Sequence, residues 1–437
     1  MSAASARALP GGPVAASAGT AAAVDPDELR VLLVALGGAM NAAGEAVNEI
    51  EDRLRLVAAA YGAPAARVMV LPTFLAITLG PAETPVLEET RQFGGAFRLD
   101  QTAALFDLLK RAERAEVAPA DGLATLTEII ERRPRFRPWT RIAGHTILTL
   151  GVCLVLHPTA ADVAVAVVLG AAVGAFRQFG SRWPTIQVLM PVLAAALVSA
   201  VAMALVRAGW KVDLRAMLAP LVTFLPGAAL TMGTIEIAAG EMVAGSSRLI
   251  SGSLQLLLLA FGIIAGAQLV GEPSEAHLIT APAALLGDWS PWLGVLVFGV
   301  GVWIYFSGPS LFWLCVVLYA AWVGQVIGDQ LFGAYVSAFC GALVMTPVAY
   351  LVERQASGPP ALVTFLPAFW LLVPGALGLV GVTELLGIHG PGSLADLLGT
   401  FGAIAGIALG VLCGYPIYRS AVGIASQVSR LPTSHSQ

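Results

Sequence analysis

Apolar residues follow two different patterns along the chain, and the change falls near residue 141. Between residues 25 and 135, apolar positions recur every three or four residues among frequent Asp, Glu, Lys and Arg. After residue 141, apolar runs follow one another and charged residues are sparse. An α-helix needs about 20 apolar residues to cross a bilayer, and these runs have that length. The pattern predicts a small soluble N-terminal domain followed by a polytopic α-helical membrane region.

The N-terminal domain, residues 25–135, is predicted to be α/β or α+β. Helical spacing of apolar residues predicts a helix over 26–62, with Pro26 in its first turn and Gly62 at its end. The segment RVMVLPTFLAITLG is rich in β-branched and aromatic residues and predicts a strand or strand pair, and EETRQFGGAFRL predicts another strand. DQTAALFDLLKRAERAEV, opening on Asp100 as its cap, and ADGLATLTEIIERR are predicted helices.

The membrane region is predicted to contain ten spans in two halves. The first half covers 141–271 and the second 285–418, while 1–24 is a predicted disordered tail and 419–437 a C-terminal tail. Short separators, HPTAAD and SGPS, leave the count open by one or two. The predicted spans are 142–158, 160–179, 186–207, 216–239, 249–270, 285–306, 309–327, 330–352, 361–386 and 395–417.

One motif, PGA-x4-G-x2-E, occurs in the fourth and the ninth predicted span, 148 residues apart. Two apolar strings also recur, LVTFLP at an offset of 141 and FGxIAG at 140, so no single alignment satisfies all three. Because five spans are an odd number, the second half enters the membrane in the opposite direction. The sequence thus predicts the inverted repeat that is characteristic of secondary transporters.

The proline of each motif lies near the middle of its span, where it frees a backbone carbonyl. In hydrocarbon a free carbonyl is tolerated only where protein or a wet cavity satisfies it, so we expect a broken helix pair around a site for a zwitterion. The alternative is a simple kink, with the threonine hydroxyls bonded to their own helices. The candidate substrate-binding residues are Thr223, Pro226, Gly227, Thr231, Thr234, Pro374, Gly375 and Thr383.

The glutamates that end the two motifs, Glu236 and Glu384, are candidates for proton coupling or gating, because an acid inside a membrane is costly. In the alternative, they are solvated at the interface. Arg248 is predicted either to extend to the interface or to pair with Glu236 or Glu241 as part of an inner gate.

Composition and charge narrow the function classes. The chain is 57% hydrophobic and 12% charged, and its net charge of −4 shows no basic stripe for nucleic acid. Arginines and lysines near the span ends place both termini and the soluble domain in the cytoplasm. The lysines close no phosphate-binding loop, and the cysteines and histidines lack metal spacing, so no cofactor or metal is expected. His145 is predicted to be an interface histidine, with a place in a proton relay as the alternative.

Three stretches together resemble the threonine/serine exporter family: LGGAMNAAGEAVNEIEDRLRLVAAAYG at 36–62, GTIEIAAGEMVAGSSRLISG at 233–252 and LLVPGALGLVG at 371–381. The resemblance implies a ten-span exporter in the bacterial inner membrane that moves threonine and serine outward, driven by the proton gradient as an antiporter. The alternatives are a membrane-anchored enzyme or regulator acting through the N-terminal domain, and a small-solute channel. Homo-oligomerisation stays open.

Overall fold

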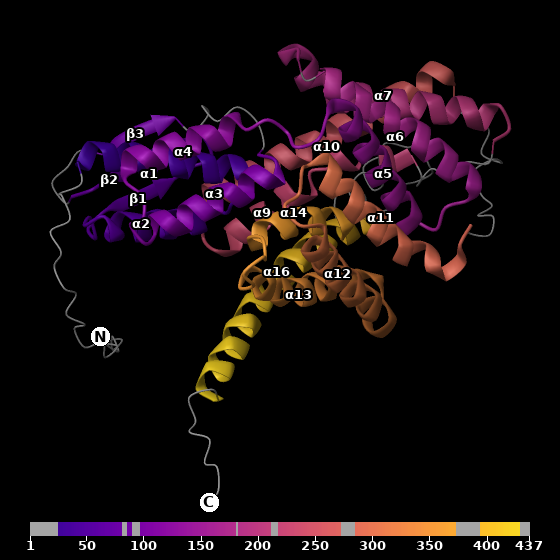
Figure 1. Cartoon of the computed structure of the whole chain (residues 1–437). Helices are drawn as coiled ribbons and strands as arrows, with labels where there is room; N and C mark the ends of the chain where they lie inside the picture. The colour runs from indigo at the N-terminus through magenta and orange to yellow at the C-terminus, as the bar shows by residue number, and fades with distance from the viewer. Residues whose placement is uncertain are drawn as a thin grey trace, which may run out of the picture.

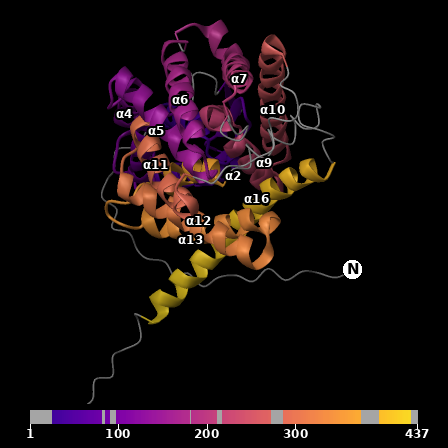
Figure 2. The ribbon, with the colours of Figure 1, turned by 90° about the vertical axis from the view of Figure 1, so that its right-hand side faces the viewer.

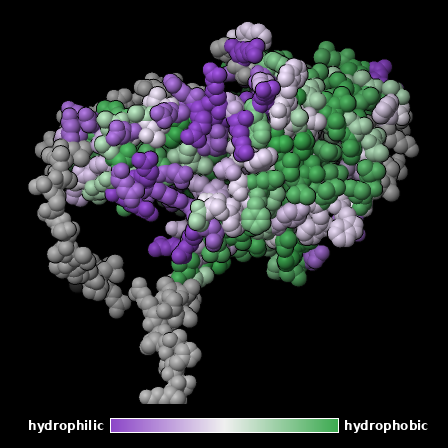
Figure 3. Space-filling view, viewed as in Figure 1, coloured by the Kyte–Doolittle hydropathy of each residue, from purple (hydrophilic) through white to green (hydrophobic). Residues whose placement is uncertain are grey.

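The computed structural model describes residues 25–80, 85–89, 97–180, 182–210, 217–271, 285–372 and 394–428. An N-terminal unit, residues 26–131, lies at one end of a group of long helices (Figure 1). In the view of Figure 3 the surface of this unit is largely hydrophilic, whereas the long helices present a continuous hydrophobic surface. The change of pattern near residue 141 therefore separates a water-exposed unit from a lipid-compatible one.

The N-terminal unit combines four helices with a three-stranded antiparallel sheet of order β1-β2-β3. Leu75 and Ile77 of β2 are fully buried and belong to the same apolar core as Leu32 and Leu36 of α1, so the helices cover one face of the sheet. The predicted strand pair is confirmed. The elements are α1 (Pro26–Ala43), α2 (Val47–Ala60), β1 (Arg67–Val70), β2 (Phe74–Thr78), β3 (Val86–Glu89), α3 (Leu99–Ala112) and α4 (Pro119–Glu131).

The single helix predicted over 26–62 is wrong, because the chain breaks it into α1 and α2. Gly44 ends α1 in the left-handed conformation, with φ 90°, and its N–H reaches back to the last turn. Glycine adopts this conformation without steric cost. The apolar spacing continues on both sides of the turn, so the spacing alone does not reveal that the helix is broken. The restart at Val47 directs the N-terminus of α2 toward the membrane helices, where Val47 N–H donates to Glu236.

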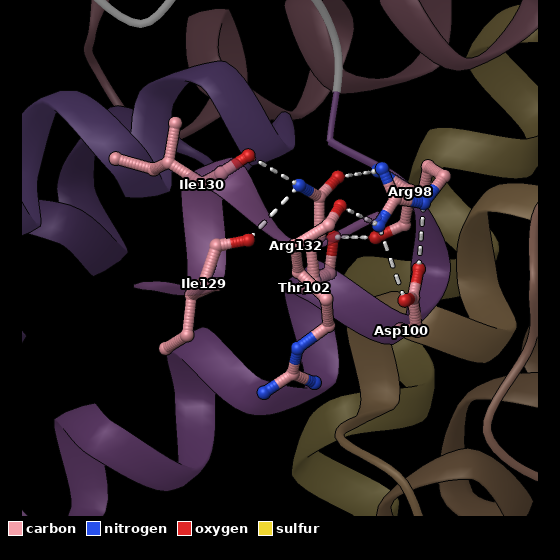
Figure 4. A network of polar contacts seen from close by, with 7 residues as sticks. Arg98, Asp100, Thr102, Ile129, Ile130 and Arg132 are labelled. Atoms are coloured by element: carbon pink, nitrogen blue, oxygen red, sulfur yellow. Dashed lines mark hydrogen bonds and ion pairs between the residues drawn. The ribbon is translucent and has the colours of Figure 1, made fainter. Parts of the chain in front are cut away.

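Hydrogen bonds between side chains and backbone join the start of α3 to the end of α4 (Figure 4). The Gln101 amide donates to the carbonyls of Ile129 and Ile130, and the Arg98 guanidinium donates to Arg132 O at 2.8 Å. These bonds satisfy carbonyls that the end of α4 leaves without helical partners. Asp100 was expected to cap α3, but α3 begins at Leu99 and the Asp100 carboxylate instead pairs with Arg98.

Six helices of the described residues are long and apolar enough to cross a membrane, by length and composition. They are found in α6, α7, α10, α12, α13 and α16, and two shorter apolar helices are α9 and α14. The helices after residue 135 are α5 (Pro138–Val155), α6 (Ala160–Gly180), α7 (Pro184–Arg207), η2 (Ala219–Phe224), α9 (Gly227–Ala238), α10 (Met242–Val270), η4 (Gly287–Trp289), α11 (Ser290–Tyr305), α12 (Leu311–Phe332), α13 (Ala334–Glu353), α14 (Ala361–Leu371) and α16 (Leu394–Val428).

Helices α5 and α11 cross at glycines and run antiparallel. A Cβ atom added to Gly151 would lie 2.2 Å from the backbone nitrogen of Phe298, and one added to Gly301 would lie 2.2 Å from that of Leu148. Only a residue without a side chain permits such an approach of two backbones. Gly144 and Gly294 make the same kind of contact with the backbones of Tyr305 and Val155, which extends the close crossing along the pair.

Two further helix pairs, α7 with α10 and α13 with α16, pack through glycines on the later helix. Gly262 of α10 lies against Val192 O and the Ala195 side chain, and Gly266 lies against Ala196 O and Ser199. In α16, Gly410 lies against Phe339 O and Ala342, and Gly414 against Leu343 O and Thr346. Figure 2 shows α6, α7 and α10 on one side of the molecule and α12, α13 and α16 on the other.

The N-terminal unit docks where α5 and α10 begin and where α9, α11 and α13 end. Ala244 of α10 and Leu362 of α14 belong to the apolar core of the unit. Leu99 N–H donates to Phe306 O, just after α11, at 3.1 Å, and Lys110 pairs with Glu353 at 3.3 Å. This end of the helices, called the docked end below, is therefore distinct from the opposite end, where α5 ends and α11 begins.

Candidate functional site

The fourth predicted span, residues 216–239, is interrupted at the first copy of the PGA-x4-G-x2-E motif. The chain forms the 3-10 helix η2 up to Phe224, leaves helical geometry at Leu225, and starts α9 at Gly227. Pro226 precedes α9 with φ −82° and ψ 27°, and no side chain caps the new helix. Proline lacks an N–H and clashes with the preceding turn, so the expected break in this span is confirmed.

The carbonyls that the break releases are satisfied by neighbouring helices. The Arg177 guanidinium of α6 donates to Thr223 O at 2.9 Å and lies over the Phe224 ring at 4.6 Å. The Gln255 amide of α10 donates to Phe224 O at 2.6 Å. Arg177 is cationic and Gln255 is polar, and both stand on apolar helices. Their side chains donate the hydrogen bonds that water would donate to these carbonyls outside a membrane. The interruption is thus an integral part of the packing of the helices.

The threonines near the break have different environments. Thr231 is fully buried, and its hydroxyl has no hydrogen-bond partner among the described residues. Thr234 donates its hydroxyl to Leu230 O of its own helix at 2.9 Å, as membrane threonines commonly do. The Thr223 hydroxyl lies 3.2 Å from His145 Nε2. An unpaired buried hydroxyl costs about 1–3 kcal/mol, which distinguishes Thr231 from Thr223 and Thr234.

His145 is fully buried, so the prediction of an interface histidine is wrong. Its Nδ1 lies 2.9 Å from Gly170 O, and its ring packs edge-on against Tyr305 at 5.2 Å. Gly170 and Gly174 let α6 approach α5 closely enough to enclose this ring. The sequence does contain the spacing Gly-x3-Gly in the second predicted span, a helix-packing signal that could have indicated burial.

At the docked end, Glu236 and Arg248 form a buried ion pair. Arg248 Nε lies 3.1 Å from Glu236 Oε2, and the glutamate is fully buried. Gly233 and Gly245, on the facing turns of α9 and α10, bring the two backbones into contact beside this pair. Of the two alternatives for Arg248, extension to the interface or pairing with an acid, the structure shows the pairing with Glu236. Glu241 stands at the start of α10.

Two hydrogen bonds connect the N-terminal unit to this ion pair. Val47 N–H, the first of α2, donates to Glu236 Oε1 at 3.1 Å, and Arg248 Nη2 donates to Glu45 O at 2.7 Å. The residue that should cap α2, Ala46, has no polar side chain. Glu236 therefore caps a helix that lies 189 residues away in sequence, where the partial positive charge of the helix N-terminus favours a carboxylate.

A second carboxyl group, that of Glu45, lies in the same junction. Burial raises the pKa of Glu45 to about 7, against the lowering effects of the hydrogen bond from Ala46 N–H and the charges of Arg53 and Arg248. The neighbouring Glu49 carboxylate adds a further raising effect. A group with a pKa near neutrality changes charge in the physiological range, so the junction between unit and helices contains a titratable contact.

The second motif lies outside the described residues, which include 361–372 but not 373–393. Pro374, Gly375, Thr383 and Glu384 therefore stay predictions. The described residues contain no group of three or more His, Cys, Asp or Glu side chains that could hold a metal ion.

Comparisons with known proteins give one match. A sequence model of the family described as "Putative threonine/serine exporter" matches residues 31–270. The matched region includes the N-terminal unit from α1 onward, the interrupted span and the Glu236–Arg248 pair, and it ends with α10. No curated protein and no solved structure gives a significant match.

Proposed function

Since this chain belongs to the threonine/serine exporter family, we propose that it exports small hydroxylated amino acids across the membrane, driven by the proton gradient through alternating access. The observation that carries the proposal is the interrupted helix at Leu225–Pro226, with its carbonyls held by Arg177 and Gln255 and a buried free hydroxyl at Thr231 one turn into α9. Broken helices of this kind bind substrates in secondary transporters.

Glycine contacts support a ten-span inverted repeat. The pairs Gly151–Phe298 and Gly301–Leu148 exchange roles when the two helices are interchanged, as a twofold axis between α5 and α11 requires. The contacts of Gly262 and Gly410 correspond across the other helix pairs, and these residues are 148 residues apart. This is the spacing of the PGA-x4-G-x2-E motifs, and it favours that register over the offset of 140 from the FGxIAG strings.

In the proposed substrate site, the break lies between a cation and a buried hydroxyl. Arg177 approaches the end of η2, and Gly227 opens α9 with backbone N–H groups that lack helical partners. A substrate carboxylate suits these N–H groups. We assign substrate contacts to Thr223, Pro226, Gly227 and Thr231, and on the second half to Pro374, Gly375 and Thr383. Thr234 is left out of this set, because its hydroxyl is bonded within its own helix.

For proton coupling, we propose that Glu236 accepts a proton from the docked side. Protonation would remove its charge attraction to Arg248 and weaken the hydrogen bond from Val47 N–H, because both contacts favour the carboxylate. Glu241 would stand beside this gate, and Glu384 would take the corresponding role at the opposite face. The ion pair and the docked unit would thus close the path from the cytoplasm until a proton arrives.

The proposed orientation puts the N-terminal unit and both termini in the cytoplasm of a bacterial cell, with the chain in the inner membrane. Arg137 and Arg141 at the start of α5 lie at the docked end, as do Arg354 after α13 and Arg248 in α10. An excess of arginine at one end of the spans is typical of the cytoplasmic side.

The test of export uses cells loaded with a threonine or serine dipeptide. Efflux of the free amino acid should be faster with the gene than without it, and an uncoupler should abolish the difference. Equal efflux with and without the gene would refute export, and a difference that survives the uncoupler would refute proton coupling. Downhill equilibration without accumulation in proteoliposomes would indicate a channel instead.

The test of the site compares Thr231→Val with Thr234→Val, a matched pair on one helix. Valine replaces the hydroxyl of threonine with a methyl group, which fills similar space and forms no hydrogen bond. We expect Thr231→Val to raise the half-saturating threonine concentration about tenfold, the value of one lost hydrogen bond of about 1.4 kcal/mol. Thr234→Val should change it by less than about threefold, since that hydroxyl already serves its own helix. Equal effects would contradict the assignment of Thr231.

A further inference from the structure

A cavity of about 580 Å³ opens at the end of the helices opposite the docked unit. It lies between the end of α5, the start of α11, the last turns of α12 and the start of α13. Its polar and aromatic lining includes His157, Asp288, Trp292, Trp322, Gln325 and Asp329. The volume is within the range of small-molecule sites, about 300–1,000 Å³, and exceeds the size of one small amino acid.

Two polar groups of the lining are enclosed and unpaired. Trp322 Nε1 and Gln325 Oε1 are inaccessible, and neither has a hydrogen-bond partner among the described residues. The indole N–H is only a donor, and the amide oxygen is only an acceptor. An unpaired buried group of either kind costs about 1–3 kcal/mol. A shift of these two side chains that opens both atoms to the cavity would let a ligand with an acceptor and a donor satisfy them together.

The carboxylates and aromatic rings of the lining indicate where the ammonium group of a ligand binds. Asp288 and Asp329 are exposed on the lining, so the cavity presents two carboxylates to a cation. Trp292 and Trp322 meet edge to face with centroids 6.4 Å apart, and the Tyr319 hydroxyl holds Trp292 by donating to its carbonyl at 2.8 Å. Indole faces beside carboxylates form the environment that attracts an ammonium group.

The backbone at the edge of this cavity is in an uncommon conformation. His157 follows α5 with φ 56°, one of three described non-glycine residues with positive φ. This left-handed region is unfavourable for residues with a Cβ, although histidine enters it more often than most. Strained residues gather at functional sites, and here the conformation puts the imidazole on the cavity lining.

We propose that this cavity is a second amino-acid subsite, at which the substrate is held on the membrane face opposite the N-terminal unit before release. Asp288, Asp329 and the Gln325 amide oxygen bind the ammonium group, and Trp322 Nε1–H donates to the carboxylate. The subsite rests on the proposed export function for its ligand, and it is distinct from the break at Pro226, which is built by other helices.

The first test measures binding to the purified full-length chain in nanodiscs. The probes are radiolabelled threonine, with ethanolamine (ammonium without carboxylate) and 3-hydroxybutyrate (carboxylate without ammonium) as competitors. We expect ethanolamine to compete and 3-hydroxybutyrate to compete at least tenfold less well. Asp329→Asn and Asp288→Asn should each weaken ethanolamine binding at least tenfold. Trp322→Phe should weaken threonine binding, whereas Trp289→Phe, on an exposed side chain outside the lining, should not.

The second test separates the subsite from the transport function. In proteoliposomes, threonine added on the face opposite the N-terminal unit should inhibit transport, and Asp329→Asn should weaken that inhibition at least tenfold while leaving half-saturation from the docked face unchanged. If the wild-type chain does not transport but ethanolamine binding depends on Asp288 and Asp329, export is wrong and the ammonium site stands. If the chain transports and these folded variants alter neither binding nor inhibition, the subsite is wrong.

Discussion

The first group of membrane helices, α5 to α10, and the second group, α11 to α16, share their backbone contacts and differ in their side-chain chemistry. In both, a later helix packs on an earlier one through glycines, at Gly262 in the first and Gly410 in the second. His145 of α5 stands in the polar cluster with Thr223, whereas the residue that occupies the matching place on α11, 150 residues later, is the buried Val295. Close backbone approach is thus common to the groups, whereas at this described position the first group has a polar side chain and the second an apolar one.

The helices flanking these shared pairs also differ. In the first group α6 packs on α5, with Gly170 and Gly174 against Thr149 and His145. In the second group α12 packs instead on α13, where Gly324 and Gly328 meet Cys340. Because α12 packs on α13, its last turns lie beside the cavity of about 580 Å³ that Trp322 and Gln325 line. Asymmetric packing of one helix therefore gives the two groups different surroundings at the end opposite the docked unit.

The largest expected effect tests the shared contact. Gly151→Leu and Gly301→Leu should each prevent α5 and α11 from packing, because even a Cβ would lie 2.2 Å from a backbone nitrogen that cannot move aside. Size-exclusion profiles of the expressed protein should show loss of the folded species for both. Gly402→Leu is the control, since a Cβ there meets nothing within 4 Å. Tolerance of one substitution but not the other would break the equivalence of the two helices.

A smaller effect compares two ion pairs at the docked end, one within the membrane helices that the N-terminal unit contacts and one between the unit and α13. Arg248→Met leaves Glu236 buried without its cation and should cost about 3–5 kcal/mol. Lys110→Met removes a partly exposed partner of Glu353 and should cost no more than about 1 kcal/mol. Thermal unfolding and protease protection of α2 would measure both. If both substitutions lowered the free energy of unfolding equally, the ion pairs of the two helix groups would contribute equally at the docked end.

The polar cluster is tested by making the first group resemble the second at one position. His145→Val should cost about 1–3 kcal/mol, because Gly170 O and the Thr223 hydroxyl lose their partner in a buried place. His145→Asn supplies a donor and an acceptor and should recover part of that stability. Thermal unfolding in detergent measures the differences. A neutral His145→Val would remove the chemical contrast between α5 and α11.

The last comparison concerns pH at the docking junction. Because the pKa of Glu45 is raised to about 7 in the docked state, docking takes up a proton, so it should be strongest at low pH and weaken as pH rises toward 7. The charged or titratable groups around Glu45 are Glu49, Arg53, Arg248 and Tyr350. Protease protection of the N-terminal unit between pH 5 and 8 should follow this course and become flatter in Glu45→Gln. An unchanged pH course in that variant would exclude Glu45 as its source.

Local chemistry made some features predictable from the sequence. The break at Pro226 follows from the missing N–H of proline, and the strand pair from the β-branched composition of residues 67–80. The pairing of Glu236 with Arg248 was one of two options, because an isolated charge in an apolar run needs either a partner or the interface. Burial of His145 was missed, since it depends on how closely Gly170 lets α6 approach.

By itself, the sequence determined where the chain becomes apolar, where proline and glycine interrupt a helix, and that the motif around the interruption occurs twice. These properties depend on residues within one or two turns of each other. The tertiary structure alone decided that Glu236 caps α2 by accepting from Val47 N–H, that α5 and α11 cross at glycines, and that Trp322 and Gln325 line one cavity. Such contacts join segments far apart in the chain, and their energy exists only once packing has excluded both lipid and water.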